Sequence, residues 1–309
     1  MNSAGKVSVT TEERHGVIYG VVAYLIWGVI PIYFMAVRFA SAPEVLAHRI
    51  VWSVILLAGL LTVLGQIRLV VQLPRRLVFG LGASSLLLAS NWLIYVWALF
   101  HGRMIETSLG YYINPLVTVM LGVAVLAERP SRWQWIALAI AAAGVGHELL
   151  VQDRIPWVAL GLALSFGLYG LLRKQLGVAS LPGLAVEVLW LMPAALAYLA
   201  WNYVEDGKMI VSHTSAQWSL LAVGGLVTIL PLLAFTASTM RIPLTILGFL
   251  QYLSPSIALV IAILIYDEHM RPGQLLTFAC IWLALLIFSG EGLYVRYDRR
   301  CHQRRGKPA

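Results

Sequence analysis

Charged residues are scarce in this sequence. Only 12% of its 309 residues are Asp, Glu, Lys or Arg, about half the share found in a typical soluble domain. Hydrophobic residues make up 60% of the chain, and the mean hydropathy is +0.82. Apolar runs of about 20 residues recur from end to end, each long enough to cross a hydrocarbon core of about 30 Å. The composition excludes a water-soluble globular domain and predicts a polytopic membrane protein.

Cysteine is almost absent, and the motifs of common enzymes are missing. Cys280 lies in an apolar run and Cys301 in a basic tail, which suggests neither a disulfide framework nor a metal site. The sequence contains no HExxH, GxSxG or P-loop motif. We therefore expect no enzymatic activity, no ATP hydrolysis by this chain, no metal and no cofactor.

Ten apolar stretches are separated by segments rich in proline, glycine and charge, which predicts ten transmembrane helices. No signal-peptide cleavage pattern precedes the first stretch, so we expect it to stay in the protein as a helix. The fold class that we expect is an all-α polytopic membrane protein. The predicted spans are 17–37, 44–65, 78–100, 105–127, 133–150, 156–173, 182–201, 217–238, 244–266 and 273–294.

Basic residues are distributed unevenly between the two sides of these spans. With a cytoplasmic N-terminus, most of the 22 Lys and Arg residues fall on the cytoplasmic side, including the tail from Arg296 to Lys307. The positive-inside rule then predicts that both termini are cytoplasmic. We interpret the basic tail as an orientation signal that also meets anionic lipid, and we expect no nucleic acid as a partner.

One sequence pattern occurs twice. Residues 111–130 read YYINPLVTVMLGVAVLAERP, and residues 251–270 read QYLSPSIALVIAILIYDEHM. Each copy would hold five helices, an odd number, so the second copy would enter the membrane from the opposite side. This predicts two inverted five-helix repeats, at 1–150 and 151–309, an arrangement that suits alternating access. The offset of 140 residues pairs Tyr112 with Tyr252, Pro115 with Pro255 and Glu128 with Glu268.

The repeated prolines fall near the middle of the fourth and ninth spans. A proline there lacks an N–H and frees the carbonyl four residues earlier, which must be buried in protein or line a wet cavity. Two interpretations are open: a kink that only improves packing, or a loosened turn that faces a substrate. Polar neighbours at both symmetric positions favour the second interpretation, with Pro115 and Pro255 beside Tyr112, Asn114, Gln251 and Tyr252.

The repeated glutamates, Glu128 and Glu268, lie at helix ends near the membrane surface. They could close gates between the helices. Alternatively they could pair with Arg129, Arg132 or Arg271, or cap the following helix, which we expect to begin at Ser131. We do not consider them catalytic.

Few ionisable residues fall inside the predicted spans, and His48, Arg49 and Glu187 are the candidates for charge or proton coupling. Ionisable groups in the hydrocarbon region are rare and commonly mark a transport or proton pathway. An offset of 139 relates His48 to Glu187, so each half carries one group able to bind a proton. Structural alternatives stay open: Arg49 can snorkel to the headgroups, and Glu187 can pair with Arg173 or Lys174.

Aromatic residues are abundant, with eleven Trp and thirteen Tyr. Many are typical of the interfacial belts of membrane proteins. Those deeper in the spans could line a cavity for flat or amphipathic organic molecules, although ordinary packing is the alternative for each. The candidate substrate-binding residues are Asn91, Tyr95, Tyr111, Tyr112, Asn114, Tyr169, Gln251 and Tyr252.

Several segments resemble a known family. NPLVTVMLGVAVLAERPSRWQWIALAIAAAGV is similar to the signature of helices 4 and 5 in the drug/metabolite transporter superfamily, EamA type. PEVLAHRIVWS, NWLIYVWAL, SLGYYINPLV and LALSFGLYGLLRK resemble its RarD subgroup. The second copy departs from the signature at Ser254, which replaces the Asn found at 114, and at Asp267, which replaces Ala127.

The resemblance implies ten helices in two inverted halves, with a central cavity formed by helices 1–4 and 6–9. It also implies a permease or exporter of the bacterial inner membrane, acting on chloramphenicol-like drugs or amino-acid-like metabolites. The expected partners are this substrate, the bilayer and, for coupled transport, protons, while a homo-oligomer stays open. The alternatives are an uncoupled facilitator, a membrane scaffold or sensor without transport, and a membrane enzyme.

Overall fold

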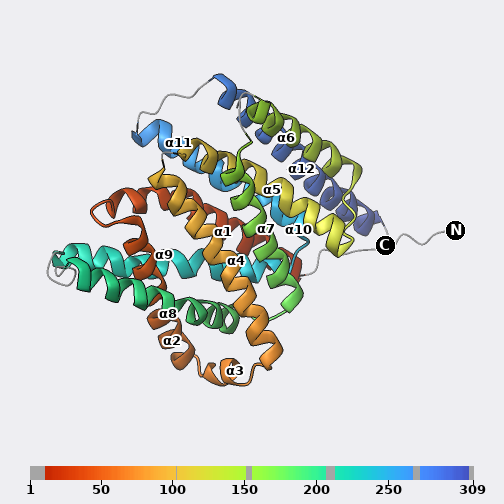
Figure 1. Ribbon diagram of the computed structural model, residues 1–309. Coiled ribbons are helices and arrows are strands. Elements are labelled where there is room, and N and C mark those ends of the chain that lie inside the picture. The colour runs from red at the N-terminus through yellow and green to blue at the C-terminus, as the bar shows by residue number, and fades with distance from the viewer. Residues whose placement is uncertain (1–10, 102, 151–154, 207–212, 267–271, 306–309) are drawn as a thin grey trace.

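The computed structural model describes residues 11–101, 103–150, 155–206, 213–266 and 272–305 (Figure 1). Within these ranges all regular structure is helical, which confirms the all-α class. The helices are α1 Thr11–Ala36, α2 Ala42–Val63, α3 Ile67–Val71, α4 Arg75–Phe100, α5 Met104–Leu126, α6 Arg132–Leu150, α7 Trp157–Leu176, α8 Ser180–Asp206, α9 Ser215–Thr239, α10 Leu244–Gln251, α11 Leu253–Tyr266 and α12 Pro272–Arg305.

The helices differ from the predicted spans in two places. The short helix α3 occupies the link between the second and third spans, where no helix was predicted. The ninth span is divided at Tyr252 into α10 and α11. Pro255 is the third residue of α11 and has no N–H to offer the carbonyl of Gln251. The missing N–H costs little in the first turn of a new helix, so a break just before it relieves the proline.

Seven segments are long and apolar enough to cross a membrane, which supports a multi-pass protein. By contrast, α6 has Arg132 and Gln134 in its first turn, and α7 has Arg173 and Lys174 in its last. The ten-span count therefore stays a prediction. The seven segments are Thr11–Ala36, Ala42–Val63, Arg75–Ala98, Glu106–Leu126, Ser180–Asn202, Ser215–Thr239 and Leu244–Ile265.

The outer surface of α1 shows what the molecule presents to its surroundings. Large apolar side chains recur there every three or four residues, so they form one stripe along the helix. A stripe of this length would be costly in water, but it suits lipid chains. The exposed residues of the stripe are Ile18, Val22, Leu25, Val29 and Ile32.

Helices that precede residue 150 pack mainly against helices that follow residue 155. α1 contacts α9 and α11, α2 contacts α8 and α9, and α4 contacts α7 and α8. α5 contacts α7 and α10, while α6 lies beside α12 along one edge of the molecule (Figure 1). The two predicted repeats thus interlock, and they share their buried core.

An aromatic cluster forms the middle of that core, where α1, α7 and α9 meet. Phe235 of α9 is 1% exposed and its ring contacts four others. It stacks on Tyr169 with centroids 5.8 Å apart, and it lies 5.0 Å from Phe166. Trp27 and Tyr24 of α1 approach it edge-on at 5.6 and 6.3 Å. Such pairs stabilise beyond their buried area.

Truncating the central ring tests this packing. Phe235→Ala should lower the free energy of unfolding by about 3 kcal/mol or more, because it leaves a cavity among four rings. Phe79→Ala is the control, since Phe79 is 65% exposed, and it should change stability by less than about 1 kcal/mol. Thermal denaturation in detergent measures both variants, and equal effects would contradict the packing described here.

Candidate functional site

The candidate residues fall into three groups. One group surrounds Arg49 of α2, a second surrounds Glu187 of α8, and the third lies between α5 and α10. Glu268 lies outside the described residues. The structure therefore does not gather the candidates at one site, and each group has its own chemistry.

Arg49 is held in place by α9. Its Nε donates to the Thr228 hydroxyl at 2.8 Å. Thr228 is 1% exposed and donates its own proton to the carbonyl of Gly224 at 2.7 Å. A Cβ at Gly224 would lie 2.9 Å from Cγ of Arg49 and 2.4 Å from the hydroxyl of Tyr33. Only glycine lets α9 approach these side chains so closely.

Aromatic rings surround the Arg49 guanidinium. Its Cζ lies 5.5 Å from the ring centroid of Phe34 on α1 and 5.3 Å from that of Trp92 on α4. Both distances suit cation–π attraction. Tyr95 extends the row from Phe34 at 6.4 Å, and Tyr111 follows Tyr95 at 6.5 Å.

The position of Arg49 favours a role inside the bundle over snorkelling. The guanidinium is directed at α9 and lies among side chains from α1 and α4. In the part of the chain that the structure describes, no carboxylate oxygen lies within 4.0 Å of it. A charge in such surroundings is costly unless something else compensates for it.

His48 is buried in the first half of α2, at the end where Glu44 contacts His213. Its ring meets Trp218 edge-on at 5.3 Å. Its Nε2 is enclosed and has no hydrogen-bond partner among the described residues. Nearby, Nε2 of His213 lies 2.8 Å from Oε1 of Glu44, a contact that joins the start of α2 to the segment before α9.

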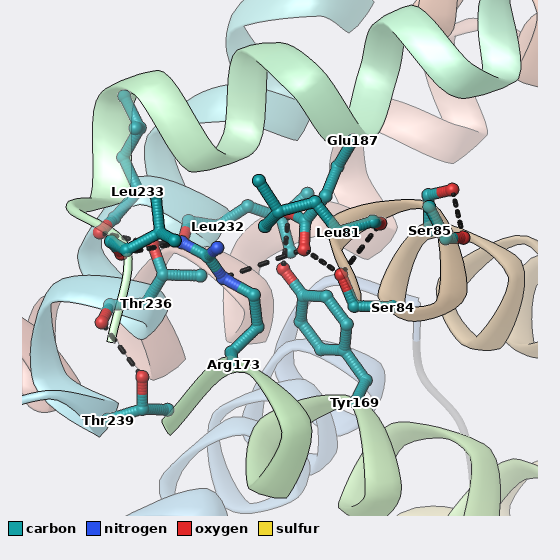
Figure 2. Close-up of polar contacts among 12 residues, drawn as sticks. Leu81, Ser84, Ser85, Tyr169, Arg173, Glu187, Leu232, Leu233, Thr236 and Thr239 are labelled. Atoms are coloured by element: carbon teal, nitrogen blue, oxygen red, sulfur yellow. Dashed lines mark hydrogen bonds and ion pairs between the residues drawn. The ribbon is translucent and has the colours of Figure 1, made fainter. Parts of the chain in front are cut away.

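Glu187 lies at the centre of the second group, shown in Figure 2. Its side chain is fully buried, and its carboxylate faces residues from α4 and α7. The Ser84 hydroxyl donates to one oxygen, Oε1. The Tyr169 hydroxyl donates to the other, Oε2, at 3.3 Å. The carboxylate therefore links three helices from both halves.

The charge of Glu187 is matched by Arg173. Nε of Arg173 lies 3.5 Å from Oε1 of Glu187, and both side chains are at most 1% exposed. Nη2 of Arg173 donates to the carbonyl of Val178 at 3.4 Å. A Cβ at Gly183 would come within 2.4 Å of Nη1, so the guanidinium fills space that a larger residue would take. Of the two partners expected for Glu187, the structure places Arg173 there. Lys174 instead donates to the carbonyls of α9 residue Thr239, at 2.9 Å, and of Ile242.

Asn91 and Ser165 join α4 to α7. The Asn91 amide donates to the carbonyl of Leu162 at 2.9 Å and to the Ser165 hydroxyl at 3.0 Å. These bonds use both amide protons of Asn91, so in this conformation a substrate could reach only its oxygen.

The third group lies where α5 crosses the junction of α10 and α11. Nε2 of Gln251 donates to the Thr118 hydroxyl at 3.1 Å, and Thr118 donates to Oδ1 of Asn114 at 3.5 Å. The Tyr252 hydroxyl donates to the carbonyl of Tyr112 at 3.4 Å. The two repeated tyrosines thus meet each other across the halves.

The two repeated prolines have different surroundings. Pro115 lies inside α5, which is continuous through it, whereas Pro255 lies in the first turn of α11, just after the break at Tyr252. The second half therefore has an interrupted helix where the first half has an unbroken one.

Glu128 corrects our expectation of local pairing or capping. Its oxygens accept from the backbone N–H groups of Leu244 and Thr245 at 2.7 and 2.8 Å, and from the Thr245 hydroxyl at 2.7 Å. The carboxylate caps α10, not α6, because the first amides of α10 have no partners within their own helix. Ser131, where we expected that helix to begin, instead precedes α6 and caps it by accepting from the N–H of Gln134 at 3.1 Å.

Sequence reasoning missed several residues of these groups, among them Phe34, Thr118 and Thr228. The two threonines are polar residues inside apolar runs, a signal that was available. Phe34 carried no signal, because one more aromatic in an apolar helix is ordinary. Ser84 was visible only as a small residue suited to close helix packing.

The chain is similar to known transporters. The EamA-like transporter family matches it twice, over residues 14–146 and 155–290. An uncharacterized transporter of Vibrio cholerae is 44% identical over 94% of this chain and 96% of its own length. Protein RarD of Escherichia coli is 38% identical over 92% of this chain and 97% of its own.

Two further similarities are more distant. The chloramphenicol-sensitive protein RarD of Pseudomonas aeruginosa is 35% identical over 88% of this chain and 92% of its own length. A solved crystal structure of a protein matches with a TM-score of 0.68 and 16% identity, covering 88% of this chain and 96% of that one. At this identity the structural likeness shows the fold alone.

Breaking the buried ion pair should be far more costly than breaking an exposed one. Glu187→Gln leaves Arg173 buried without a carboxylate and should lower the free energy of unfolding by about 3–5 kcal/mol. Adding Arg173→Met should recover part of the loss, since no unpaired charge remains. Thermal denaturation in detergent measures both.

The control for this prediction is Glu12→Gln. Glu12 accepts from Nε of Arg241 at 2.8 Å, but its side chain is 68% exposed. Its removal should cost less than about 1 kcal/mol. A loss for Glu187→Gln no larger than this would mean that the buried pair does not hold α7 to α8.

Removing the cap on α10 should loosen its first turn. Glu128→Ala takes away the acceptor of the Leu244 and Thr245 amides, so their hydrogen exchange should accelerate about tenfold. Exchange measured by mass spectrometry on peptides that begin near residue 240 reports this. Glu148→Ala, near the last turn of α6, should leave the same peptides unchanged, and equal exchange in all three proteins would contradict the assigned cap.

Proposed function

This chain belongs to the EamA-like transporter family, with RarD proteins among its relatives, and on that premise we propose that it is a secondary transporter of small organic molecules that works by alternating access. We propose ten transmembrane helices in two inverted repeats, 1–150 and 151–309. The protein would span the bacterial inner membrane several times, with both termini in the cytoplasm. Its cargo would be chloramphenicol-like drugs or amino-acid-like metabolites, and export is the proposed direction.

The observation that carries this proposal is the reciprocity of the helix packing. Each helix of the first half can be matched to its counterpart in the second: α1 to α7, α2 to α8, α4 to α9, α5 to α10 and α11, and α6 to α12. When every helix is exchanged for its counterpart, each helix–helix contact given under the overall fold turns into another observed contact or stays the same contact. Packing of this kind is what a pseudo-two-fold axis between inverted repeats would produce. The double match of the family, over 14–146 and 155–290, supports the same division.

The polar contacts at one end of the bundle suggest which state the molecule is in. At the end that we expect to be cytoplasmic, Glu128 binds the start of α10, and Lys174 binds the carbonyls just before it. Ser238 also donates to the carbonyl of Gly16 at 2.7 Å, joining α9 to α1. We interpret this as a closed cytoplasmic end. Transport would require these contacts to separate while the opposite end closes.

The aromatic cluster around Phe235 would form the barrier between the two ends. It connects the aromatic row beside Arg49 to the Arg173–Glu187 pair. On one side, Trp27 of the cluster lies on α1, the helix that also carries Phe34 beside Arg49. On the other side, Tyr169 contacts both Phe235 and Glu187. Substrate contacts would come from the eight candidate polar and aromatic residues named above. His48 and Glu187 would carry protons in coupled transport, and Arg49 would set the charge preference.

Flux into proteoliposomes tests the proposal. The purified protein should give saturable uptake of at least one radiolabelled compound among chloramphenicol, aromatic amino acids and small metabolites. A pH gradient imposed without a substrate gradient should drive uptake if His48 or Glu187 couples protons. Replacing the coupling residue, by His48→Ala or by Glu187→Gln in protein shown to be folded, should then abolish the drive.

The other outcomes are equally informative. Saturable flux that ignores the pH gradient identifies a facilitator, in which His48 and Glu187 serve recognition or structure. The absence of flux for every compound, with folded protein, would contradict transport and favour a membrane scaffold or sensor.

A further inference from the structure

We propose that Arg49 binds the carboxylate of the substrate, and that the cargo of this protein is a monocarboxylate with an aromatic or apolar body. The inference rests on the proposed transport function and narrows its substrate class. It is carried by a guanidinium that the protein orients inside the bundle but does not neutralise.

The hydrogen bonds of Arg49 leave most of its donors free. A guanidinium has five N–H groups, and Nε uses its one in the bond to Thr228. Thr228 can only accept here, since its proton goes to the Gly224 carbonyl at 2.7 Å. Among the described residues, no side chain or carbonyl accepts from the two terminal nitrogens. These nitrogens form the fork that binds a carboxylate with two parallel hydrogen bonds.

Arg173, a fully buried arginine, has its charge compensated within the protein. Arg173 is 1% exposed, and Glu187 lies 3.5 Å from its Nε. Arg49 is half-buried on α2, between buried His48 and Ile50, yet no carboxylate of the described chain reaches it. Because an uncompensated charge in a membrane protein is costly and commonly functional, the missing anion points to a ligand.

The number of charges selects the kind of anion. The phenols of Tyr33, Tyr95 and Tyr111 are near enough to interact electrostatically with Arg49, and phenols are neutral at physiological pH. A single cation balances a single negative charge. A phosphate monoester, with close to two charges at pH 7, would remain partly unbalanced in a low-dielectric site. A carboxylate matches both the charge and the fork.

The rings around Arg49 indicate the chemical character of the rest of the ligand. Phe34 and Trp92 contact the guanidinium and restrict where it can move. Tyr95 and Tyr111 continue the row away from it, and Tyr111 is 49% exposed. A flat or apolar body attached to the carboxylate would lie against these rings. Aromatic faces and few polar groups are typical of small-molecule sites.

A purely structural role for Arg49 is the competing explanation. The bond to Thr228 does join α2 to α9, but it uses one donor of five and needs no charge. A glutamine at 49 could not supply the charge, whereas a lysine could. The two explanations therefore differ in how binding responds to ligand charge.

Ligand-induced stabilisation of the full chain in detergent provides the test. The probes are 3-phenylpropionate and its amide, 3-phenylpropanamide, which share one body and differ in charge. The acid should raise the Tm in a saturable way, because a ligand that binds only the folded state stabilises it, and the amide should not. In Arg49→Gln the apparent Kd for the acid should rise at least about tenfold.

Two further variants serve as controls. Arg38→Gln removes the same charge from an exposed residue at the end of α1 and should keep the wild-type Kd. Arg49→Lys keeps the charge without the fork and should bind the acid with intermediate affinity. If Arg49→Gln does not fold, Arg49→Lys and the comparison of acid with amide in the wild type decide the matter.

Several results would overturn the proposal: equal shifts with acid and amide, no shift with the acid up to about 10 mM, tighter binding of 2-phenylethylphosphonate than of the acid, or an unchanged Kd in Arg49→Gln. Failure of this site is distinguishable from failure of transport. Saturable flux of a neutral compound that Arg49→Gln leaves intact would keep transport and refute the carboxylate site. Binding that needs Arg49, without flux of any compound, would keep the carboxylate site and refute transport.

Discussion

A charge inside a membrane protein must be compensated, because the hydrocarbon around the bundle cannot solvate it. The Arg173–Glu187 pair meets this requirement within the protein, and in doing so it fixes α7 against α8 and, through Ser84, α4. Tyr169 joins the same carboxylate to the aromatic cluster around Phe235. The packing at the centre of the molecule thus depends on one buried ion pair and on the aromatic cluster that Tyr169 joins to it.

Arg49 meets the requirement differently. The protein orients it with one neutral hydrogen bond and two aromatic faces, which position a charge without cancelling it. A paired charge stabilises one conformation, whereas an unpaired charge makes the stability of the protein depend on whether an anionic ligand binds. The contrast explains how a single bundle can hold a rigid centre and a responsive site. Both ionic groups lie on helices that contact the opposite half.

The sequence predicted most of the helices, because apolar length and proline–glycine breaks are local signals, but it missed α3 and the division of the ninth span into α10 and α11. It also indicated the Arg173–Glu187 pair, since both residues lie near the short link between α7 and α8. It could not indicate that Glu128 caps α10, because that contact spans 116 residues and depends on where the ninth span breaks. Nor could it place Thr228 against Arg49, since the register of α2 on α9 is set by tertiary packing.

Distances measured between spin labels at the two ends of the bundle test the alternating-access account most directly. With Cys280 and Cys301 replaced by serine, labels at Arg14 and Arg129 would span the end closed by Glu128, and labels at Arg38 and Ser108 the opposite end. The account predicts two distance populations at each end, which shift in opposite directions when a transported ligand is added. A single unchanging distance at both ends, or ends that widen together, would contradict it.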